Sequence, residues 1–259
     1  MTKEAWQSLI KGIENSLRLR TFPVGIKFAS DDDELKSLRK MRSPAKNSLT
    51  CQLITMARTY GWSFTATATD LMPVCASIMG LRDLPPEVKK GALRRVWCAT
   101  EEDAEKIEAA IPRIPLNKFK ALLIGPQAVG AFEPDIVLIY GNPAQIILMI
   151  NALQFDKYER LVFYCVGESS SCADTIAQCY FSKKPSLSIP CFGERKYGHA
   201  QDDELVMALP VSAVEKVKRN LEELAKRGIR YPIAYFGAQT DPSCGLPPAY
   251  QELLNLKER

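Results

Sequence analysis

The chain has 259 residues, of which 46% are apolar and 25% charged, and its net charge is +4. This is the composition of an ordinary globular protein, and the charge is spread along the chain without a compact basic block, which argues against nucleic acid as a partner. The longest apolar runs, such as Ile146 to Ile150, are too short to cross a membrane. Because Met1 leads into a charged amphipathic stretch instead of an apolar signal core, we expect a cytoplasmic protein.

The first half of the chain is predicted to be mainly helical. Helices are expected where apolar residues recur at helical spacing or where a polar cap precedes them: residues 4–19, about 49–60, about 70–80, a short stretch from Pro85, and 105–110. The run from Pro23 to Phe28 predicts a first strand.

The second half is predicted to alternate strands with helices. Apolar runs predict strands over 120–124, 135–140, 161–166, 186–189 and 204–209. Capping residues and periodicity predict helices over 143–153, 172–181 and 212–227, and the Pro- and Gly-containing stretch 237–248 is expected to be a loop. This alternation favours an α/β fold, with a mixed sheet flanked by helices. Without a linker or repeat, residues 1–259 are expected to form a single domain.

The most informative feature of the sequence is its eight cysteines beside one histidine. In a reducing cytoplasm such cysteines are more often metal-binding or catalytic than bridged. Cys51, Cys75 and Cys172 each fall in the first turns of a predicted helix, where N–H groups and the helix dipole stabilise a thiolate. Cys191 leaves a predicted strand just before Gly193, which lets backbone N–H groups approach closely. These four thiolates are expected to hold an anionic iron–sulfur cluster of the 4Fe-4S type.

Two alternatives to the cluster remain open at this stage. No Cys-x-x-Cys pair occurs, which argues against a ferredoxin run, a zinc ribbon or a thioredoxin-like motif, so the ligands would meet only in the fold. Zinc on the same four thiolates would make a non-enzymatic binding module. A third hypothesis is an enzyme with one reactive thiolate, such as Cys172. Whether the protein is an enzyme therefore stays open.

The remaining cysteines are expected to have other roles, because free cysteine also packs as a small hydrophobe. Core packing is the preferred interpretation for Cys98, for Cys165 within a predicted strand, and for Cys179. Cys179 follows Cys172 by seven residues, about 10 Å along a helix, which is too far to share one metal ion. Cys244 lies in a predicted loop and receives no assigned role.

Several segments carry a resemblance to a known family. The most specific of these segments extends from Pro185 through Cys191 to Arg195. The other segments occur in the same order as in the family: Phe22–Lys27, Cys51-Gln52 with Ala57-Arg58, Cys75 with Gly80-Leu81, Pro134–Val137, Asn142–Gln145, Ser171-Cys172, Asp202–Glu204 and Pro210. In these segments the chain resembles the domain of unknown function 169 family, a prokaryotic, mostly anaerobe-associated group without a settled activity. The resemblance supports the same four cysteines and implies no reaction. Glu194 stands where the family more usually has aspartate.

Other polar residues are candidates for ligand binding. Arg195 is placed to bind an anion or a cluster sulfide, although a surface ion pair with Asp202 or Glu204 is an equal alternative. Asn142 and Gln145 follow a predicted strand, where α/β proteins often bind ligands, although a helix cap is the preferred interpretation.

The sequence also limits the chemistry and the partners. His199, the one histidine, lies in a polar loop, so catalysis by a Ser/His/Asp or Cys/His arrangement is not expected. No phosphate loop or dinucleotide fingerprint occurs. We expect a redox partner protein or a small-molecule substrate, no nucleic acid or membrane, and, from the general frequency of symmetric oligomers, a homodimer.

Overall fold

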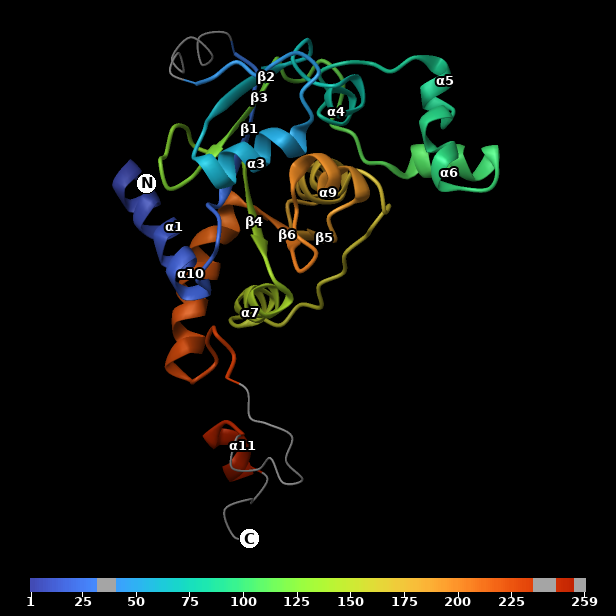
Figure 1. The fold of residues 1–259 in the computed structure, drawn as a ribbon. Coiled ribbons are helices and arrows are strands. Elements are labelled where there is room, and N and C mark those ends of the chain that lie inside the picture. The colour runs from blue at the N-terminus through green and yellow to red at the C-terminus, as the bar shows by residue number, and fades with distance from the viewer. Residues whose placement is uncertain (32–40, 235–245, 254–259) are drawn as a thin grey trace.

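The computed structural model describes residues 1–31, 41–234 and 246–253, and its centre is one six-stranded sheet (Figure 1). The strands lie in the order β2-β3-β1-β4-β6-β5. Their bounds are β1 Val24–Ala29, β2 Phe64–Thr67, β3 Ala121–Pro126, β4 Ile136–Gly141, β5 Ser186–Ser188 and β6 Leu205–Pro210. The α/β class predicted from the sequence is confirmed.

The pairing of the strands corrects one expectation. All five pairings between these strands are antiparallel, and parallel pairing within the described residues is limited to two isolated bridges, Arg42 with Phe64 and Ser48 with Leu71. The expected mixed sheet is therefore wrong. Continuous apolar runs are typical of parallel strands because helices cover both of their faces. Here helices cover both faces of an antiparallel sheet, which produces the same sequence pattern.

Helices cover the two faces of the sheet. Their bounds are α1 Lys3–Leu17, α3 Thr50–Tyr60, α4 Pro73–Ile78, α5 Pro86–Lys89, η1 Ala92–Trp97, α6 Glu101–Ala110, α7 Pro143–Gln154, η2 Ser170–Ala177, α8 Gln178–Ser182, α9 Phe192–Gly198, α10 Val211–Lys226 and α11 Pro248–Leu253. None of the described helices combines the length and the apolar character that a membrane crossing needs.

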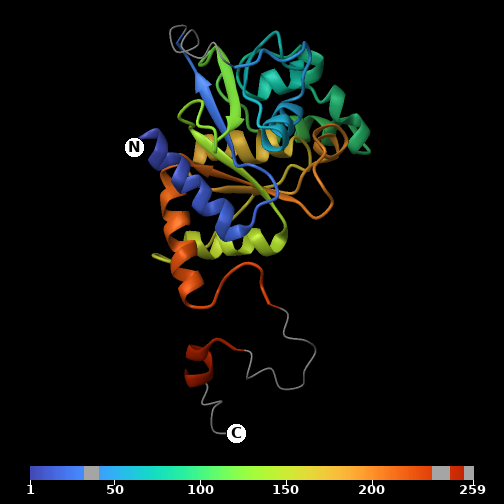
Figure 2. The ribbon, with the colours of Figure 1, turned by 60° about the vertical axis from the view of Figure 1, so that its left-hand side comes forward.

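The central strand β4 shows how the two faces differ. Val137 and Ile139 point into a core shared with α1, α7 and α10, which lie together on one side of the sheet in Figure 2. Leu138 and Tyr140 point into a second core with α3, α4 and η2. This alternation is the two-residue period of a strand. The second core contains Cys75, Cys172 and Cys179, so the cysteines lie on the face opposite α7.

Residues 161–166 and 172–181 differ from their predicted structure, and neither β2 nor α9 was predicted. The predicted strand over 161–166 is wrong, because these residues have no regular secondary structure, and Val162 and Tyr164 are 61% and 68% exposed. Leu161 and Phe163 are partly buried, so one side of this run contacts the core and the other faces solvent. Cys165 is exposed, and its expected core packing is wrong. The predicted helix over 172–181 begins as a π-helix, η2, and continues as α8.

Glycine at position 80 fixes the end of α4, the helix that carries Cys75. Gly80 has a φ of +71°, and a Cβ there would lie 2.6 Å from the carbonyl oxygen of Pro115. Gly228 has a similar φ of +84°, but a Cβ there would meet no atom within 4 Å. We expect Gly80→Ala to lower the free energy of unfolding by about 2–4 kcal/mol, because the cost of a left-handed backbone conformation and the cost of the steric clash add together.

The matched variant Gly228→Ala carries only the conformational penalty, about 1–2 kcal/mol. Urea denaturation of both variants measures the difference. Equal losses would show that the backbone approach at Gly80 contributes nothing to stability.

Candidate cysteine site

The four predicted cysteines lie at the starts of four helical elements. Cys51 is in the first turn of α3 and Cys75 in the first turn of α4. Cys172 is in the first turn of η2. Cys191 is the N-cap of α9, where its Sγ accepts a hydrogen bond of 3.4 Å from the N–H of Glu194. The predicted positions at helix starts are confirmed, and Cys191 joins the other three in this respect.

The fold brings these thiols into one another's electrostatic range. The Cys75 sulfur accepts a hydrogen bond from Cys172. Cys51 interacts electrostatically with Cys75, Cys172 and Cys191. The four residues come from segments far apart in sequence, so their convergence is a property of the tertiary structure.

The four thiols differ in burial, and the pKa values of the three buried ones are shifted in different directions. Cys51, Cys75 and Cys172 are 8%, 8% and 6% exposed, whereas Cys191 is half-buried. Burial, followed by the charge of Glu194, raises the pKa of Cys51. The hydrogen bond that Cys172 donates raises its own pKa and lowers the pKa of Cys75 to about 7. Without a bound metal, Cys75 is therefore the thiol that ionises most readily among these three.

The hydroxyl of Thr50 is an unexplained polar group beside these sulfurs. Thr50 is fully buried, and its Oγ1 has no well-formed hydrogen bond. It lies near Cys75 and Cys172 and favours the thiolate form of both. Buried polar atoms without a partner are rare in native proteins. An acceptor placed among the sulfurs would satisfy this hydroxyl.

A buried carboxylate connects the cysteines to the sheet. Glu194 is 2% exposed and accepts hydrogen bonds from the hydroxyls of Tyr140 and Ser170 and, at 3.2 Å, from the N–H of Ser171. The Ser170 hydroxyl in turn accepts a bond of 2.8 Å from the N–H of Cys191. Burial and the neighbouring Glu194 charge raise the pKa of Tyr140 well above its ordinary value. This network fixes η2 and α9 relative to β4.

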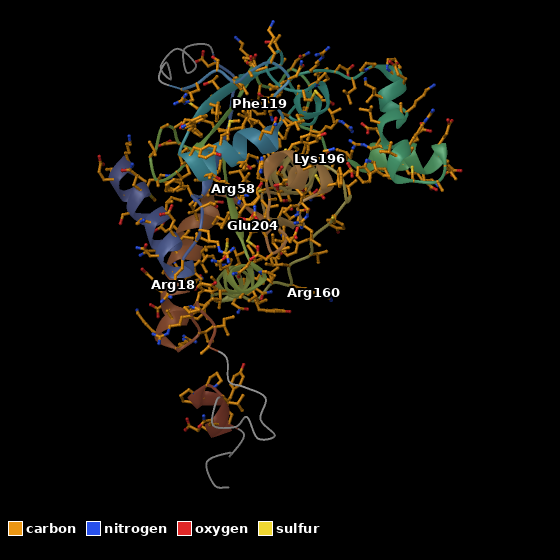
Figure 3. The ribbon with its side chains drawn as sticks, viewed as in Figure 1. Arg18, Arg58, Phe119, Arg160, Lys196 and Glu204 are labelled. Atoms are coloured by element: carbon orange, nitrogen blue, oxygen red, sulfur yellow. The ribbon has the colours of Figure 1, made fainter. Side chains whose placement is uncertain are left out.

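A buried ion pair holds the other side of the site. The Arg58 guanidinium donates to both carboxylate oxygens of Glu204 at 2.6 and 3.0 Å, and their side chains are 3% and 9% exposed. Arg58 also stacks 4.1 Å above the ring of Tyr140. Figure 3 labels both members of the pair near the centre of the molecule. The pair ties α3, which carries Cys51, to the start of β6.

A close approach of two helices was not predicted from the sequence. A Cβ at Gly198 would lie 3.0 Å from the Cβ of Cys51 and 3.3 Å from its carbonyl oxygen. The Thr55 hydroxyl donates to the Gly198 carbonyl. Glycine therefore lets α9 contact α3 directly at Cys51. The pairing of two helices distant in sequence leaves no local signal by which this glycine could be recognised.

The predicted ligand-binding residues have structural partners. Arg195 donates to the carbonyls of Pro190 and Gln201 and lies 3.6 Å from the Asp202 carboxylate. Gly193 lies in α9, where an added Cβ would contact only the Cys191 sulfur, at 3.9 Å, so close backbone approach is not what requires glycine there.

Asn142 and Gln145 form the cap of α7. The Asn142 side chain accepts from the Gln145 N–H at 2.9 Å, and the Gln145 side chain accepts from the Asn142 N–H at 2.8 Å. The helix-cap interpretation is confirmed. Because α7 covers the opposite face of the sheet, these residues do not join the cysteine site.

The other cysteines and the histidine lie in varied surroundings. Cys179 is 1% exposed, and burial raises its pKa to about 12, which confirms core packing. Cys98 is only partly buried, and its thiol donates to the Arg94 carbonyl at 3.3 Å, so the expected core position is wrong. His199 is exposed, as predicted. Cys244 lies outside the described residues.

A single metal ion needs a tight group of ligands, which most often come from four residue types. Within residues 1–31, 41–234 and 246–253, no three His, Cys, Asp or Glu side chains are grouped tightly enough to hold a single metal ion. With zinc–sulfur bonds of about 2.3 Å, a tetrahedral zinc site needs sulfurs about 3.8 Å apart.

The fold and the site define an α/β protein with a converging set of largely buried cysteines. The sequence profile of the DUF169 family, described as "Uncharacterised ArCR", matches residues 12–220, and the chain belongs to this family. A relative in Methanocaldococcus jannaschii, "Uncharacterized protein MJ0308", is 28% identical over 208 residues, which cover 77% of this chain and 86% of the relative. No solved structure matches the chain.

The lowered pKa of Cys75 predicts a specific pH dependence. In metal-free protein, alkylation of Cys75 by iodoacetamide should rise through about pH 7, because the thiolate predominates above its pKa. Cys172→Ala removes the donated hydrogen bond and should move this midpoint to higher pH. Peptide mass spectrometry resolves the individual cysteines, and Cys179 should remain unmodified as the internal control. An unchanged midpoint in Cys172→Ala would contradict the assigned hydrogen bond.

The buried ion pair predicts a large and coupled effect on stability. Either Arg58→Met or Glu204→Gln should lower the free energy of unfolding by about 3–5 kcal/mol, because each leaves a buried partner unpaired. The double variant should lose less than the sum of the two. Denaturant melts measure all three. Removing the exposed pair of Lys106 and Glu102 by Lys106→Met is the control and should have no measurable effect.

Proposed function

We propose that this protein binds an iron–sulfur cluster of the 4Fe-4S type through Cys51, Cys75, Cys172 and Cys191. The observation that carries the proposal is that four cysteines from four helical elements lie within one another's electrostatic range. The proposed role is electron transfer or reduction of a small substrate in the cytoplasm, with a redox partner protein or a small molecule as the second reactant. An iron–sulfur cluster supplies reversible electron transfer.

The residues around the sulfurs fit such a group. The backbone N–H of Gln52 is placed to donate to the Cys51 sulfur, and that of Thr50 to the Cys75 sulfur. Such donors stabilise thiolates and tune the potential of a cluster. The Thr50 hydroxyl, which has no well-formed hydrogen bond and lies beside Cys75 and Cys172, would find an acceptor in a cluster sulfide. Binding would also deprotonate Cys51 and Cys172, whose raised pKa values otherwise favour the thiol.

The cluster and the zinc alternative need different spacings of the four thiols. Each cysteine of a 4Fe-4S cluster binds a different iron, so the sulfurs are farther apart than around one ion. The iron, sulfide and zinc content of the purified protein therefore separates the two.

The protein matrix would control access to the bound group. Cys51, Cys75 and Cys172 are shielded from solvent, and Cys191 is the least buried ligand. Beside it, Phe192 is 57% exposed and stacks edge-on against Trp97 at 5.6 Å. Exchange with a partner or substrate is therefore proposed to occur on the Cys191 side.

A reactive cysteine is the second candidate function. The structure moves this hypothesis from Cys172, whose pKa is raised, to Cys75, whose pKa is lowered to about 7. Such a pKa is typical of an activated thiolate. Cys75 is only 8% exposed, so a substrate would need to enter the core to reach it.

The cluster proposal is tested by anaerobic purification followed by a visible spectrum and analyses of iron and acid-labile sulfide. We expect broad visible absorbance with both elements present, lost in Cys51→Ala and Cys191→Ala. Cys179→Ala, which removes a buried cysteine of the same core outside the proposed ligand set, is the control and should keep the absorbance.

Each other outcome favours a different alternative. Colourless protein without iron or sulfide would reject the cluster. One zinc per chain would favour the binding module. Metal-free protein with a single rapid alkylation at Cys75 would favour the reactive thiolate.

A further inference from the structure

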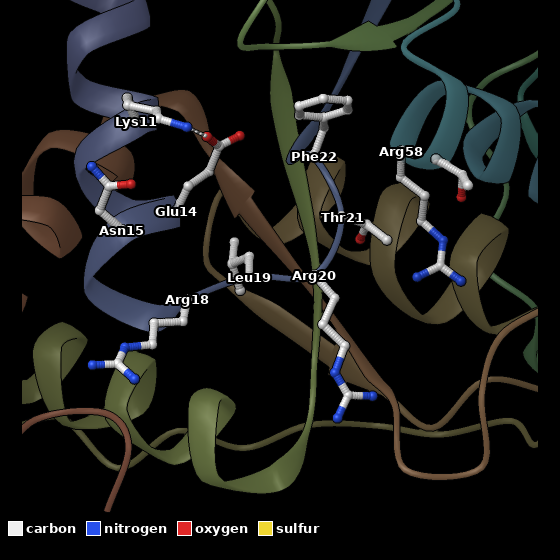
Figure 4. A pocket seen from close by; sticks show the side chains of 10 residues that line it. Lys11, Glu14, Asn15, Arg18, Leu19, Arg20, Thr21, Phe22 and Arg58 are labelled. Carbon is white, nitrogen blue, oxygen red and sulfur yellow. Dashed lines mark ion pairs between the residues drawn. The ribbon is translucent and has the colours of Figure 1, made fainter.

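A pocket on another part of the molecule is separate from the proposed cluster ligands. It lies between α1, the segment 18–22 and the end of α3, and has a volume of about 410 Å³ (Figure 4). This volume falls within the range of small-molecule sites. Its walls are formed by Lys11, Glu14, Asn15, Arg18, Leu19, Arg20, Thr21, Phe22, Arg58 and Thr59.

Most charged side chains on these walls are basic. Arg58 is held by the buried Glu204, and Lys11 lies 3.3 Å from Glu14. Arg20 has only a weak, exposed contact of 3.4 Å with Asp203. Arg18 has no carboxylate partner among the residues that the structure describes. The guanidinium groups of Arg18 and Arg20 therefore remain available to an anion.

The backbone holds Arg18 in an unusual conformation. Arg18 ends α1 with a φ of 50°, a left-handed position that usually belongs to glycine. Its carbonyl accepts a hydrogen bond of 3.2 Å from the Gln145 side chain. A long cationic residue thus occupies a position where glycine would be easier to accommodate. This anchoring fixes the base of the Arg18 side chain at the rim of the pocket.

One buried donor in the pocket walls lacks a partner. Four buried side-chain atoms without a partner occur in the described part of the chain, and Arg58 Nε is one of them. Arg58 is 3% exposed. Buried polar atoms without a partner are rare, and an N–H donor is a group that an anion satisfies. Glu14 Oε1, the other such atom in the walls, is an acceptor and gives no support to an anion.

We infer that this pocket binds a small anionic ligand, a carboxylate or a phosphate, through Arg18 and Arg20, with Arg58 as its inner wall. Guanidinium groups present paired donors that match both kinds of anion. The proposal does not depend on the cluster. An anion in this pocket would lie next to residues that support the cysteines, because Arg58 stacks on Tyr140 and the Tyr140 hydroxyl donates a hydrogen bond to Glu194.

Isothermal titration calorimetry of the full-length protein with inorganic phosphate and, separately, with succinate tests this inference. We expect saturable binding of at least one probe at millimolar concentration, and the stronger probe distinguishes phosphate from carboxylate recognition. Arg18→Gln and Arg20→Gln should each weaken binding about five- to tenfold. Glu14→Gln should strengthen it, because the one acidic side chain of the wall opposes an anion.

A matched variant keeps the test specific. Arg160 is exposed and lies apart from Arg18 and Arg58 in Figure 3, so Arg160→Gln should bind as the wild type does. Arg18 and Arg20 are exposed, so their replacement should leave the fold intact, which circular dichroism verifies. Absence of saturable binding up to about 10 mM of either probe would overturn the inference. Equal affinity in the wild type, Arg18→Gln and Arg20→Gln would overturn it as well.

Discussion

The buried carboxylate of Glu194 is the constraint on which the cysteine site depends. It receives hydrogen bonds from Tyr140 of β4 and from Ser170 and Ser171 at the start of η2, while its own backbone lies in α9. A carboxylate removed from water is stable only when such donors surround it. The donors come from separate elements, so satisfying this one group also sets where Cys172 and Cys191 lie.

The negative charge of Glu194 disfavours the thiolate form of nearby cysteines when no metal is bound. Burial, Glu194 and the neighbouring Cys75 and Cys191 oppose ionisation of Cys51. Bound metal ions would reverse this balance, because their positive charge stabilises the thiolates that bind them. Metal binding at this site would therefore be linked to loss of protons from the cysteine thiols. The nearby Arg58–Glu204 pair is neutral as a unit.

Arg58 joins the two regions of chemical interest. Arg58 lines the pocket formed with Arg18 and Arg20, and its guanidinium stacks on Tyr140, which belongs to the Glu194 network. An anion in the pocket and a charged group among the cysteines would thus interact through one rigid, buried cation. Charges interact more strongly across a buried group such as Arg58 than through bulk water, because the protein interior has a lower dielectric constant.

The sequence by itself determined the local features of this protein. Periodicity and caps identified the strands β1, β3, β4 and β6 and the long helices, because these signals are local. They also placed Cys51, Cys75 and Cys172 at helix starts. The strand predicted over 161–166 was wrong, because an apolar run does not reveal whether a partner strand lies beside it. The short β2, with two threonines, gave too weak a pattern to predict.

Only the tertiary structure decided how these pieces meet. Strand direction, the contact of Gly198 with Cys51, the Glu194 network and the basic pocket all join residues that are distant in sequence. The physical reason is that burial and hydrogen bonding between such residues depend on packing, which local propensity does not encode. The residue types for a thiolate site were visible in the chain, and the fold determined that they converge.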